Sequence, residues 1–501
     1  MRARWLASFL VLLAAGPLNS QTSLSYITLD HRVMPFLEYL VAKGAVRDPS
    51  PMERPWVVGP MLAALDEADR ARLSASERRT LDEVRRMLDT RDDPVVIDAH
   101  ARVGVRAATH DRRWPLREAG EGHVYPLGDL HLALQFGPAV LVTHPELDPR
   151  AVKWDPDYIG KHDDPLASRF QSAYVAVHTK YFHGFFGSVA RNWGPPERPG
   201  VLVSPWPYSY DHLMLQAGPE KVYLQTYVAQ LDEIPDEDGD RMRRYWIVAR
   251  VVGHPWETFN FALWQGTLIS GDKRSLEFWF VNPLKFAKQT VQEEGVRANN
   301  LLGLDLEVRP RGWPRLGLSL LVDDFQLIGS STNDEPPSYA FTLAATGPIF
   351  GGLGSLTYTQ VSNLVYRTPD PTETVMRRSV GLGRNFSDYD ETSVNARWII
   401  KPGILVGPEF TLLRQGEGDF RNPFPPDSLN SVTPTIFDGV VENTWRAAVW
   451  GQLLLPFSLA AQFDAGVHHI TDYQHQESET TTRFVGSVAL RFRFGWDWAL
   501  R

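Results

Sequence analysis

From residue 94 onward, apolar and polar residues alternate along the chain with a period of two. The first such run covers about thirteen residues, whereas an average strand of a soluble protein has about five or six. Similar runs recur at 302–309 and 483–494. The apolar positions of the first run are Val95, Ile97, Ala99, Ala101, Val103, Val105 and Ala107. Long strands with one apolar and one polar face are typical of a barrel that meets lipid outside and water inside.

The connections between these runs alternate between short and long. Short turns are expected at 137–138, 183–184, 218–219, 253–255, 310–314, 347–348, 401–403 and 455–456. Longer polar loops are expected at 108–122, 145–169, 192–211, 232–243, 267–298, 323–338, 367–389, 416–441 and 472–481. Eight turns and nine loops make seventeen connections and predict about eighteen strands, give or take two. We expect the last strand to run on to Trp498. An even strand number with short turns at one end is the arrangement of bacterial outer-membrane barrels.

Between residues 26 and 92 the apolar period is that of helices instead. The first expected helix carries an apolar stripe of Val33, Phe36, Leu37 and Leu40. We expect Asp30 to cap its start and Gly44 to end it. A second helix is expected at 60–65, and a third after Ser74, which forms a capping box with Glu77. The pattern predicts a small three-helix unit.

The first twenty residues have the features of a secretory signal. Arg2 and Arg4 precede an apolar core from Trp5 to Ala15, which is too short to span a bilayer as a helix. Cleavage is expected after Ser20. The predicted division is a signal peptide at 1–20, a periplasmic helical unit at 21–93 and an outer-membrane β-barrel at 94–501.

Composition narrows the classes of function. The 501 residues contain no cysteine, which excludes disulfides, thiolate zinc sites and a cysteine nucleophile. The net charge is -9, and there is no basic stripe of the kind that binds nucleic acid. No serine-hydrolase elbow, HExxH motif or phosphate-binding loop occurs. We therefore expect a protein that is not an enzyme and that needs no cofactor or metal.

Several segments resemble, in order and rough spacing, the Wzi family of outer-membrane capsule-assembly proteins. They are Phe-Leu-Glu-Tyr-Leu at 36–40, Arg-Asn-Trp-Gly-Pro at 191–195, Val-Leu-Val-Ser-Pro at 201–205, Asn-Pro-Leu-Lys-Phe at 282–286, Asn-Leu-Leu-Gly-Leu-Asp at 300–305 and Leu-Leu-Val-Asp-Asp-Phe at 320–325. The resemblance implies an eighteen-stranded outer-membrane barrel with a periplasmic helical bundle. It also implies a role in the attachment or assembly of capsular polysaccharide at the cell surface.

Loop 192–210 and its flanks carry the candidate contacts with an acidic polysaccharide. They are Arg191, Trp193, Arg198, Trp206, Tyr208 and Tyr210. Exposed aromatic faces stack on sugar rings, and guanidinium groups bind carboxylates in paired hydrogen bonds. The alternative is that these aromatic side chains pack the loop inside the barrel mouth.

Three other groups of polar residues could be considered as metal or catalytic sites, but their sequence patterns are less specific. Asp232, Glu233, Asp236, Glu237, Asp238 and Asp240 form an acidic loop that either is solvated or binds calcium, with a spacing unlike an EF-hand. Asp323 and Asp324 are either a surface acid pair or loop caps. His468 and His469 are adjacent on a strand, so they face opposite sides and cannot share a metal.

Two functions remain open. The favoured one is a non-enzymatic outer-membrane protein that binds or organises exported capsular or extracellular polysaccharide, with a blocked lumen. The alternative is an outer-membrane porin or diffusion channel, with an open lumen. Charges on the lumenal face, which include Arg102, Arg106, Asp305, Glu307, Arg491 and Arg493, either line a channel or neutralise one another. Expected partners are an acidic polysaccharide, outer-membrane lipid and lipopolysaccharide, and a monomer is favoured.

Overall fold

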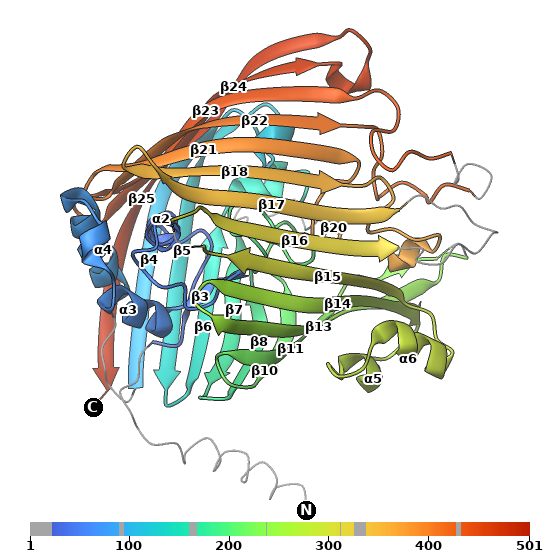
Figure 1. Ribbon diagram of the computed structural model, residues 1–501, viewed down its shortest axis with the longest axis horizontal. Helices are drawn as coiled ribbons and strands as arrows, with labels where there is room; N and C mark the ends of the chain where they lie inside the picture. The colour runs from blue at the N-terminus through green and yellow to red at the C-terminus, as the bar shows by residue number, and fades with distance from the viewer. Residues whose placement is uncertain are drawn as a thin grey trace, which may run out of the picture.

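The computed structural model describes residues 23–89, 95–158, 160, 168–236, 238–310, 312–324, 337–426 and 432–500. Eighteen antiparallel strands close into a barrel, in which each strand pairs with its neighbours in the chain and the last pairs with the first (Figure 1). The predicted fold class and strand number are confirmed. The expected signal segment lies outside the described residues. Within those residues, no helix has the length and apolarity needed to cross a membrane.

The barrel strands differ in length but follow one another in regular order. They are β4 (Val95–Ala108), β5 (His123–Phe136), β6 (Ala139–Leu147), β7 (Ser168–His178), β8 (Phe182–Val189), β10 (Asp211–Ala217), β11 (Val222–Gln230), β13 (Arg241–Trp256), β14 (Phe259–Asp272), β15 (Asn299–Val308), β16 (Arg315–Asp324), β17 (Ser338–Ile349), β18 (Gly352–Val361), β21 (Tyr389–Lys401), β22 (Ile404–Gln415), β23 (Glu442–Leu455), β24 (Leu459–Thr471) and β25 (Thr480–Leu500). Two-residue β12 (Ile234–Pro235) extends the β11–β13 hairpin.

As predicted, apolar side chains point out of the barrel and polar side chains point into its lumen. Val103 and Val105 on β4 are 51% and 43% exposed on the outer face, whereas Arg102 is buried in the lumen. On β15, Leu302 is exposed and Asp305 is buried. The barrel therefore presents an apolar outer surface, which suits hydrocarbon, and keeps its charged residues inside.

All connections alternate between short and long, but three turns lie a few residues from the predicted positions. Residues 183–184 lie within β8, 253–255 lie within β13, and 347–348 lie within β17. A register irregularity between Gly253 and Trp256 lets β13 continue through glycine and proline, which the sequence pattern marks as turn residues. The last strand continues past Trp498 to Leu500. We call the two ends of the barrel the short-turn end and the long-loop end.

Three helices form before the barrel: α2 (Met34–Ala42), α3 (Val58–Asp66) and α4 (Ala75–Leu88). The expected capping box is present, because the Ser74 hydroxyl accepts from the Glu77 amide and the Glu77 carboxylate accepts from the Ser74 amide. The expected Asp30 cap is wrong. Val33 precedes α2 without a side-chain cap, and a proline in the first turn leaves fewer backbone donors to satisfy.

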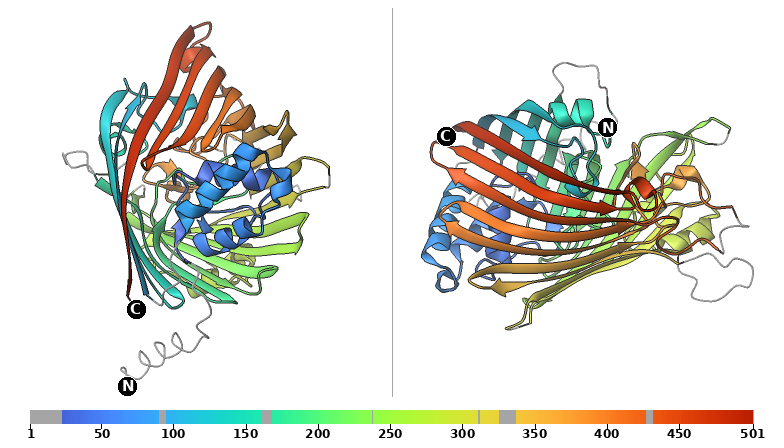
Figure 2. Two further views of the ribbon diagram at one scale, coloured as in Figure 1. Left: turned by 90° about the vertical axis from the view of Figure 1, so that its left-hand side faces the viewer. Right: turned by 90° about the horizontal axis from the view of Figure 1, so that it is seen from above.

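The helical unit lies across the short-turn end of the barrel (Figure 2, left). Its apolar core extends onto lumenal side chains of β18, β21, β22 and β23, which are Leu353, Ile399, Leu405 and Leu454. Two short strands of this unit, β1 (Tyr26–Ile27) and β3 (Trp56–Val57), pair with each other. A third, β2 (Glu53–Arg54), pairs with β9 (Asn192–Trp193) of a long loop. The unit is thus attached both to the barrel wall and to a loop from the other end.

A hydrophobic core fills the middle of the lumen. It combines side chains of the barrel wall, such as Tyr174, Trp246 and Trp264, with side chains of two inward-folded loops. The first loop, 190–210, contributes Trp193, Val201, Leu202, Val203 and Tyr210. The second, 362–388, contributes Val365, Tyr366, Val375, Leu382 and Phe386. Leu364 of the same loop is also buried. This loop also contains the hairpin of β19 (Met376–Arg377) and β20 (Val380–Gly381).

One long loop lies outside the barrel instead. Residues 273–298 form α5 (Phe278–Val281) and α6 (Ala287–Glu294), close to the long-loop end (Figure 1). Phe280 and Ala287 are buried there against Val228, Ile247 and Ile269 of the wall. The sequence pattern predicts only a long polar loop at this position, and the two helices are a finding of the structure.

Candidate functional site

The candidate site is built around loop 190–210, which folds into the lumen. The Trp193 amide donates to the Val203 carbonyl at 3.1 Å, which closes the loop on itself. The Gly200 amide donates to the Asn192 side chain at 2.7 Å. The Ser204 amide donates to the Leu382 carbonyl at 3.0 Å and so ties this loop to the second inward loop. Two backbone hydrogen bonds and one to the Asn192 side chain thus hold the loop in place.

The six predicted contact residues lie in or beside this loop, and nearly all of them are buried. Five of them, Arg191, Trp193, Trp206, Tyr208 and Tyr210, are less than 9% exposed, and the Arg198 side chain is 15% exposed. This burial agrees with the alternative that the aromatic side chains pack the loop inside the barrel. Contact of these six with a polysaccharide stays a prediction.

Charged partners surround the buried aromatic rings. The Arg250 guanidinium lies 4.7 Å from the centre of the Trp193 ring, and Arg377 lies 5.3 Å from Tyr210. Arg198 pairs with Glu391 at 2.9 Å. Such pairs neutralise the arginines locally and attach the loop to several strands.

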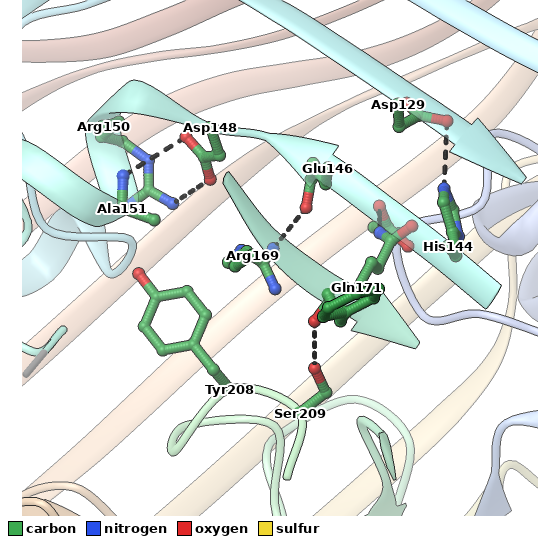
Figure 3. Close-up of polar contacts among 12 residues, drawn as sticks. Asp129, His144, Glu146, Asp148, Arg150, Ala151, Arg169, Gln171, Tyr208 and Ser209 are labelled. Carbon is green, nitrogen blue, oxygen red and sulfur yellow. Dashed lines mark hydrogen bonds and ion pairs between the residues drawn. The ribbon is translucent and has the colours of Figure 1, made fainter. Parts of the chain in front are cut away.

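Tyr208 is the most constrained of the six. Its φ of 59° lies in the left-handed region, which is costly for an aromatic residue. Its hydroxyl donates to Asp155, and the Arg113 guanidinium lies 3.6 Å from its ring centre. Burial raises the pKa of the Tyr208 hydroxyl. Figure 3 shows the ring beside Arg150 and Arg169 on the lumenal wall.

Beside Tyr208, arginine and aromatic side chains gather at the long-loop end. We call this group the mouth cluster: Arg112, Arg113, Trp114, Arg117, Trp206, Phe386 and Arg421. Trp114 is partly exposed, and its ring centre lies 5.3 Å from Trp206 and 5.5 Å from Phe386. Three guanidinium groups surround Phe386 at 4.5–5.5 Å.

Arg117 differs from its neighbours in the cluster. Arg112 pairs with Asp157 at 3.1 Å, and Arg421 pairs with Asp419 at 2.9 Å. Arg117 makes no such pair within the described chain, and its buried Nε and Nη2 atoms have no hydrogen-bond partner there. Burial lowers the pKa of this guanidinium to about 10, so it is charged at neutral pH. A buried donor without a partner is costly unless a ligand or water satisfies it.

The mouth cluster was not predicted from the sequence, because its residues come from several loops that are far apart in the chain. The signal was the Arg-Arg-Trp run at 112–114 with Arg117 in the neighbouring loop. That loop comes close to Trp206 and Phe386 only because loops 190–210 and 362–388 both fold into the lumen. The spacing of residues in the sequence does not reveal this folding.

The other predicted clusters have structural partners. The Asp236 carboxylate accepts from the amides of Asp238 and Asp240 at 3.1 and 2.8 Å, so it caps its own exposed loop. Glu237 of that loop lies outside the described residues. Asp323 accepts from the Tyr366 amide at 2.6 Å and thereby anchors the second inward loop.

Many lumenal charges pair with one another. Arg102 pairs with Asp129 at 2.8 Å, and Asp305 pairs with Arg250 at 2.9 Å. His468 contacts Arg446 at 2.7 Å in the lumen, whereas His469 contacts Thr482 at 2.9 Å. The two adjacent histidines have different partners, as their strand position predicts.

One group of residues has donor atoms close enough for a metal ion. One ligand atom each of Asp98, His100 and His131 lies within 4.8 Å of the others. However, the Arg493 guanidinium lies 3.3 Å from His100 Nδ1, and Arg102 follows on the same strand face. These cations oppose a divalent cation at this place, so we assign no metal to it.

Comparisons with known proteins support the fold. No protein-family model matches the sequence, and no curated protein matches it. Among solved structures, the chain is similar to Wzi of Escherichia coli, an outer membrane protein involved in group 1 capsule assembly and a carbohydrate-binding β-barrel. The TM-score is 0.63 at 13% identity, and the alignment covers 95% of this chain and 100% of Wzi.

Two outer membrane proteins of Pseudomonas aeruginosa are also similar. The match to OpdK has a TM-score of 0.46 at 11% identity and covers 80% of this chain and 99% of that one. The match to OprD has a TM-score of 0.44 at 10% identity and covers 80% and 95%. The match to Wzi and the closed barrel together show that the chain has the fold of an outer-membrane β-barrel.

Proposed function

We propose that this protein is a non-enzymatic member of the Wzi-like group that binds or organises exported acidic polysaccharide at the outer-membrane surface. The observation that carries the proposal is the Arg117 guanidinium, whose buried Nε and Nη2 have no hydrogen-bond partner among the described residues. It lies over the Phe386 ring, which also contacts the partly exposed Trp114 ring. Arg117 and Trp114 lie at the long-loop end, which is the extracellular end in bacterial outer-membrane barrels.

The chemistry of the mouth cluster suits a sugar carboxylate. A carboxylate offers two oxygens to the fork of a guanidinium, and such bidentate pairs are among the strong hydrogen bonds. An aromatic face beside the fork offers a platform for the apolar face of a sugar ring. Arg117 has free donors and Trp114 has free surface, so the two together match one uronic acid unit.

The filled lumen favours this function over a diffusion channel. The core to which loops 190–210 and 362–388 contribute is buried and apolar, and the helical unit covers part of the other end. A water path needs a polar, open lumen. The carbohydrate-binding description of Wzi adds support, because the two chains share a fold over most of their lengths.

The direct test is glycan binding by the purified full-length barrel in detergent, with polygalacturonate as the acidic probe and dextran as the neutral one. We expect saturable binding of polygalacturonate alone. Arg117→Gln should weaken it by roughly tenfold, the usual effect of losing a charge-assisted hydrogen bond. Arg79→Gln, an exposed arginine on α4, is the matched control and should bind normally. Equal binding by both variants would remove the mouth cluster from the proposal.

Conductance separates the two functions. We expect the folded barrel to be silent in planar bilayers, and a steady conductance would favour the diffusion channel. In cells, deletion of the gene should release polysaccharide into the medium. Unchanged retention on the cell surface would contradict a role in polysaccharide attachment.

A further inference from the structure

A narrow pocket lies at the short-turn end, far along the strands from the mouth cluster. The turn before α2 forms one side of it, and the lumenal faces of β4, β24 and β25 form the other. We call it the turn-end pocket. Its charged and amide lining is Asp30, Arg32, Arg102, Gln452, Gln462, Arg491 and Arg493.

The pocket carries an excess of positive charge, with four arginines against one aspartate. Arg102 is neutralised by Asp129, at 2.8 Å from it. Asp30, the one carboxylate of the lining, accepts a hydrogen bond from Gln171 on β7. Asp30 is thus the one carboxylate of the lining that faces both Arg32 and Arg491.

Two of these arginines have hydrogen-bond donors to spare. Asp30 and Glu146 are the described carboxylates that act on the charge of Arg491, and neither forms a hydrogen bond or ion pair with it among the described residues. Arg32 donates only weakly, from Nη1 to the Ser458 carbonyl at 3.4 Å, and its buried Nε has no partner among the described residues. Burial, and then the nearby Arg493 and Arg102, lower the pKa of Arg32 to about 10.

We propose that the turn-end pocket is a binding site for a small oxyanion, a carboxylate or a phosphate group. An oxyanion there satisfies the open donors of Arg32 and Arg491 and offsets the repulsion among the guanidinium groups. The narrow space excludes a sugar chain. Chloride lacks the paired oxygens that the guanidinium fork prefers.

The position of the site gives it a consequence for the fold. Arg32 belongs to the helical unit, whereas Arg491 and Arg493 belong to the last barrel strand. A bound oxyanion bridges the two parts and replaces a repulsion by an attraction. The helical unit is then held more firmly to the barrel wall. This inference does not depend on the proposed polysaccharide function, because the mouth cluster lies at the other end.

The test is thermal unfolding of the full-length barrel in detergent and low-salt buffer, titrated with sodium phosphate, sodium galacturonate or sodium chloride at matched ionic strength. We expect the unfolding temperature to rise and saturate with at least one oxyanion but not with chloride. A response to phosphate alone identifies phosphate as the ligand, and a response to both identifies any oxyanion. An equal response to chloride, or none at all, would overturn the proposal.

Variants locate the effect. Arg491→Gln should abolish the saturable response, and Arg491→Lys, which keeps the charge but not the fork, should weaken the affinity by roughly tenfold. Arg483→Gln is the matched control, because Arg483 lies on the same strand near the long-loop end and pairs with Glu118. Circular dichroism checks that each variant is folded. Loss of the response in Arg117→Gln would place the anion at the mouth cluster and overturn the turn-end site.

Discussion

Glu373 is a buried carboxyl group whose charge opposes the inward fold of loop 362–388. It lies in a short 3-10 turn, η4 (Pro371–Glu373), and is 7% exposed. Burial, and then the neighbouring Asp370, raise the pKa of Glu373 from 4.5 to about 7. Between these two pH values the native state holds a proton that the unfolded chain has released, so stability falls as the pH rises.

We therefore expect the stability contribution of Glu373 to be complete below about pH 4.5 and to be lost as the pH rises through about 7. At about 1.4 kcal/mol for each pKa unit, the loss is of the order of 3 kcal/mol. Glu373→Gln should reduce this pH dependence of the unfolding temperature between pH 5 and 8. Glu67→Gln, an exposed control on the helical unit, should retain it. A variant curve parallel to the wild-type curve would contradict the assignment.

At the same scale, the residues of the candidate site could be predicted only in part. Aromatic and arginine side chains in loop 190–210 were visible in the sequence, but their burial depends on contacts with segments such as 53–54 and 382 that are far away in the chain. The partly exposed Trp114 belongs to a different loop. Residue type indicates which chemistry is available, whereas long-range packing decides which side chains stay accessible.

At the scale of elements, the strands were predicted well because each one carries its own two-residue period of apolar and polar residues.

The helix pair α5–α6 was not predicted, because it is short and lies within a loop. It covers polar groups on the outer face: the Gln265 amide donates to the Lys285 carbonyl at 2.6 Å, and its oxygen accepts from the Ala287 amide at 2.8 Å. The opposite side of the pair exposes Phe278, Leu284 and Phe286 by 70–82%.

We expect this surface on the outside of the barrel to contact lipid, because its exposed side chains are apolar. Because the chain has no cysteine, Phe278→Cys gives a single site for an environment-sensitive fluorophore. We expect a blue-shifted emission in vesicles of outer-membrane lipid and lipopolysaccharide. A fluorophore at Arg79→Cys on α4 is the control and should report water. The same water-like emission at both sites would contradict lipid contact by α5–α6.

At the scale of the whole molecule, the two ends of the barrel should face different compartments. The helical unit and the short turns lie at one end, and the long loops lie at the other (Figures 1 and 2). We expect a membrane-impermeant maleimide to label Ser478→Cys, in an exposed loop, on intact cells. Arg79→Cys should be labelled only after the outer membrane is permeabilised. The reverse result would invert the proposed orientation.

The pairing of β25 with β4 joins the final segment of the chain to the first barrel strand, from Leu500 opposite Val95 to Ser487 opposite Ala108. The cylinder cannot close before β25 has been synthesised, although its partner β4 comes first among the barrel strands. A chain that lacked β25 would leave unpaired backbone groups along both β24 and β4, so a continuous wall requires this one strand.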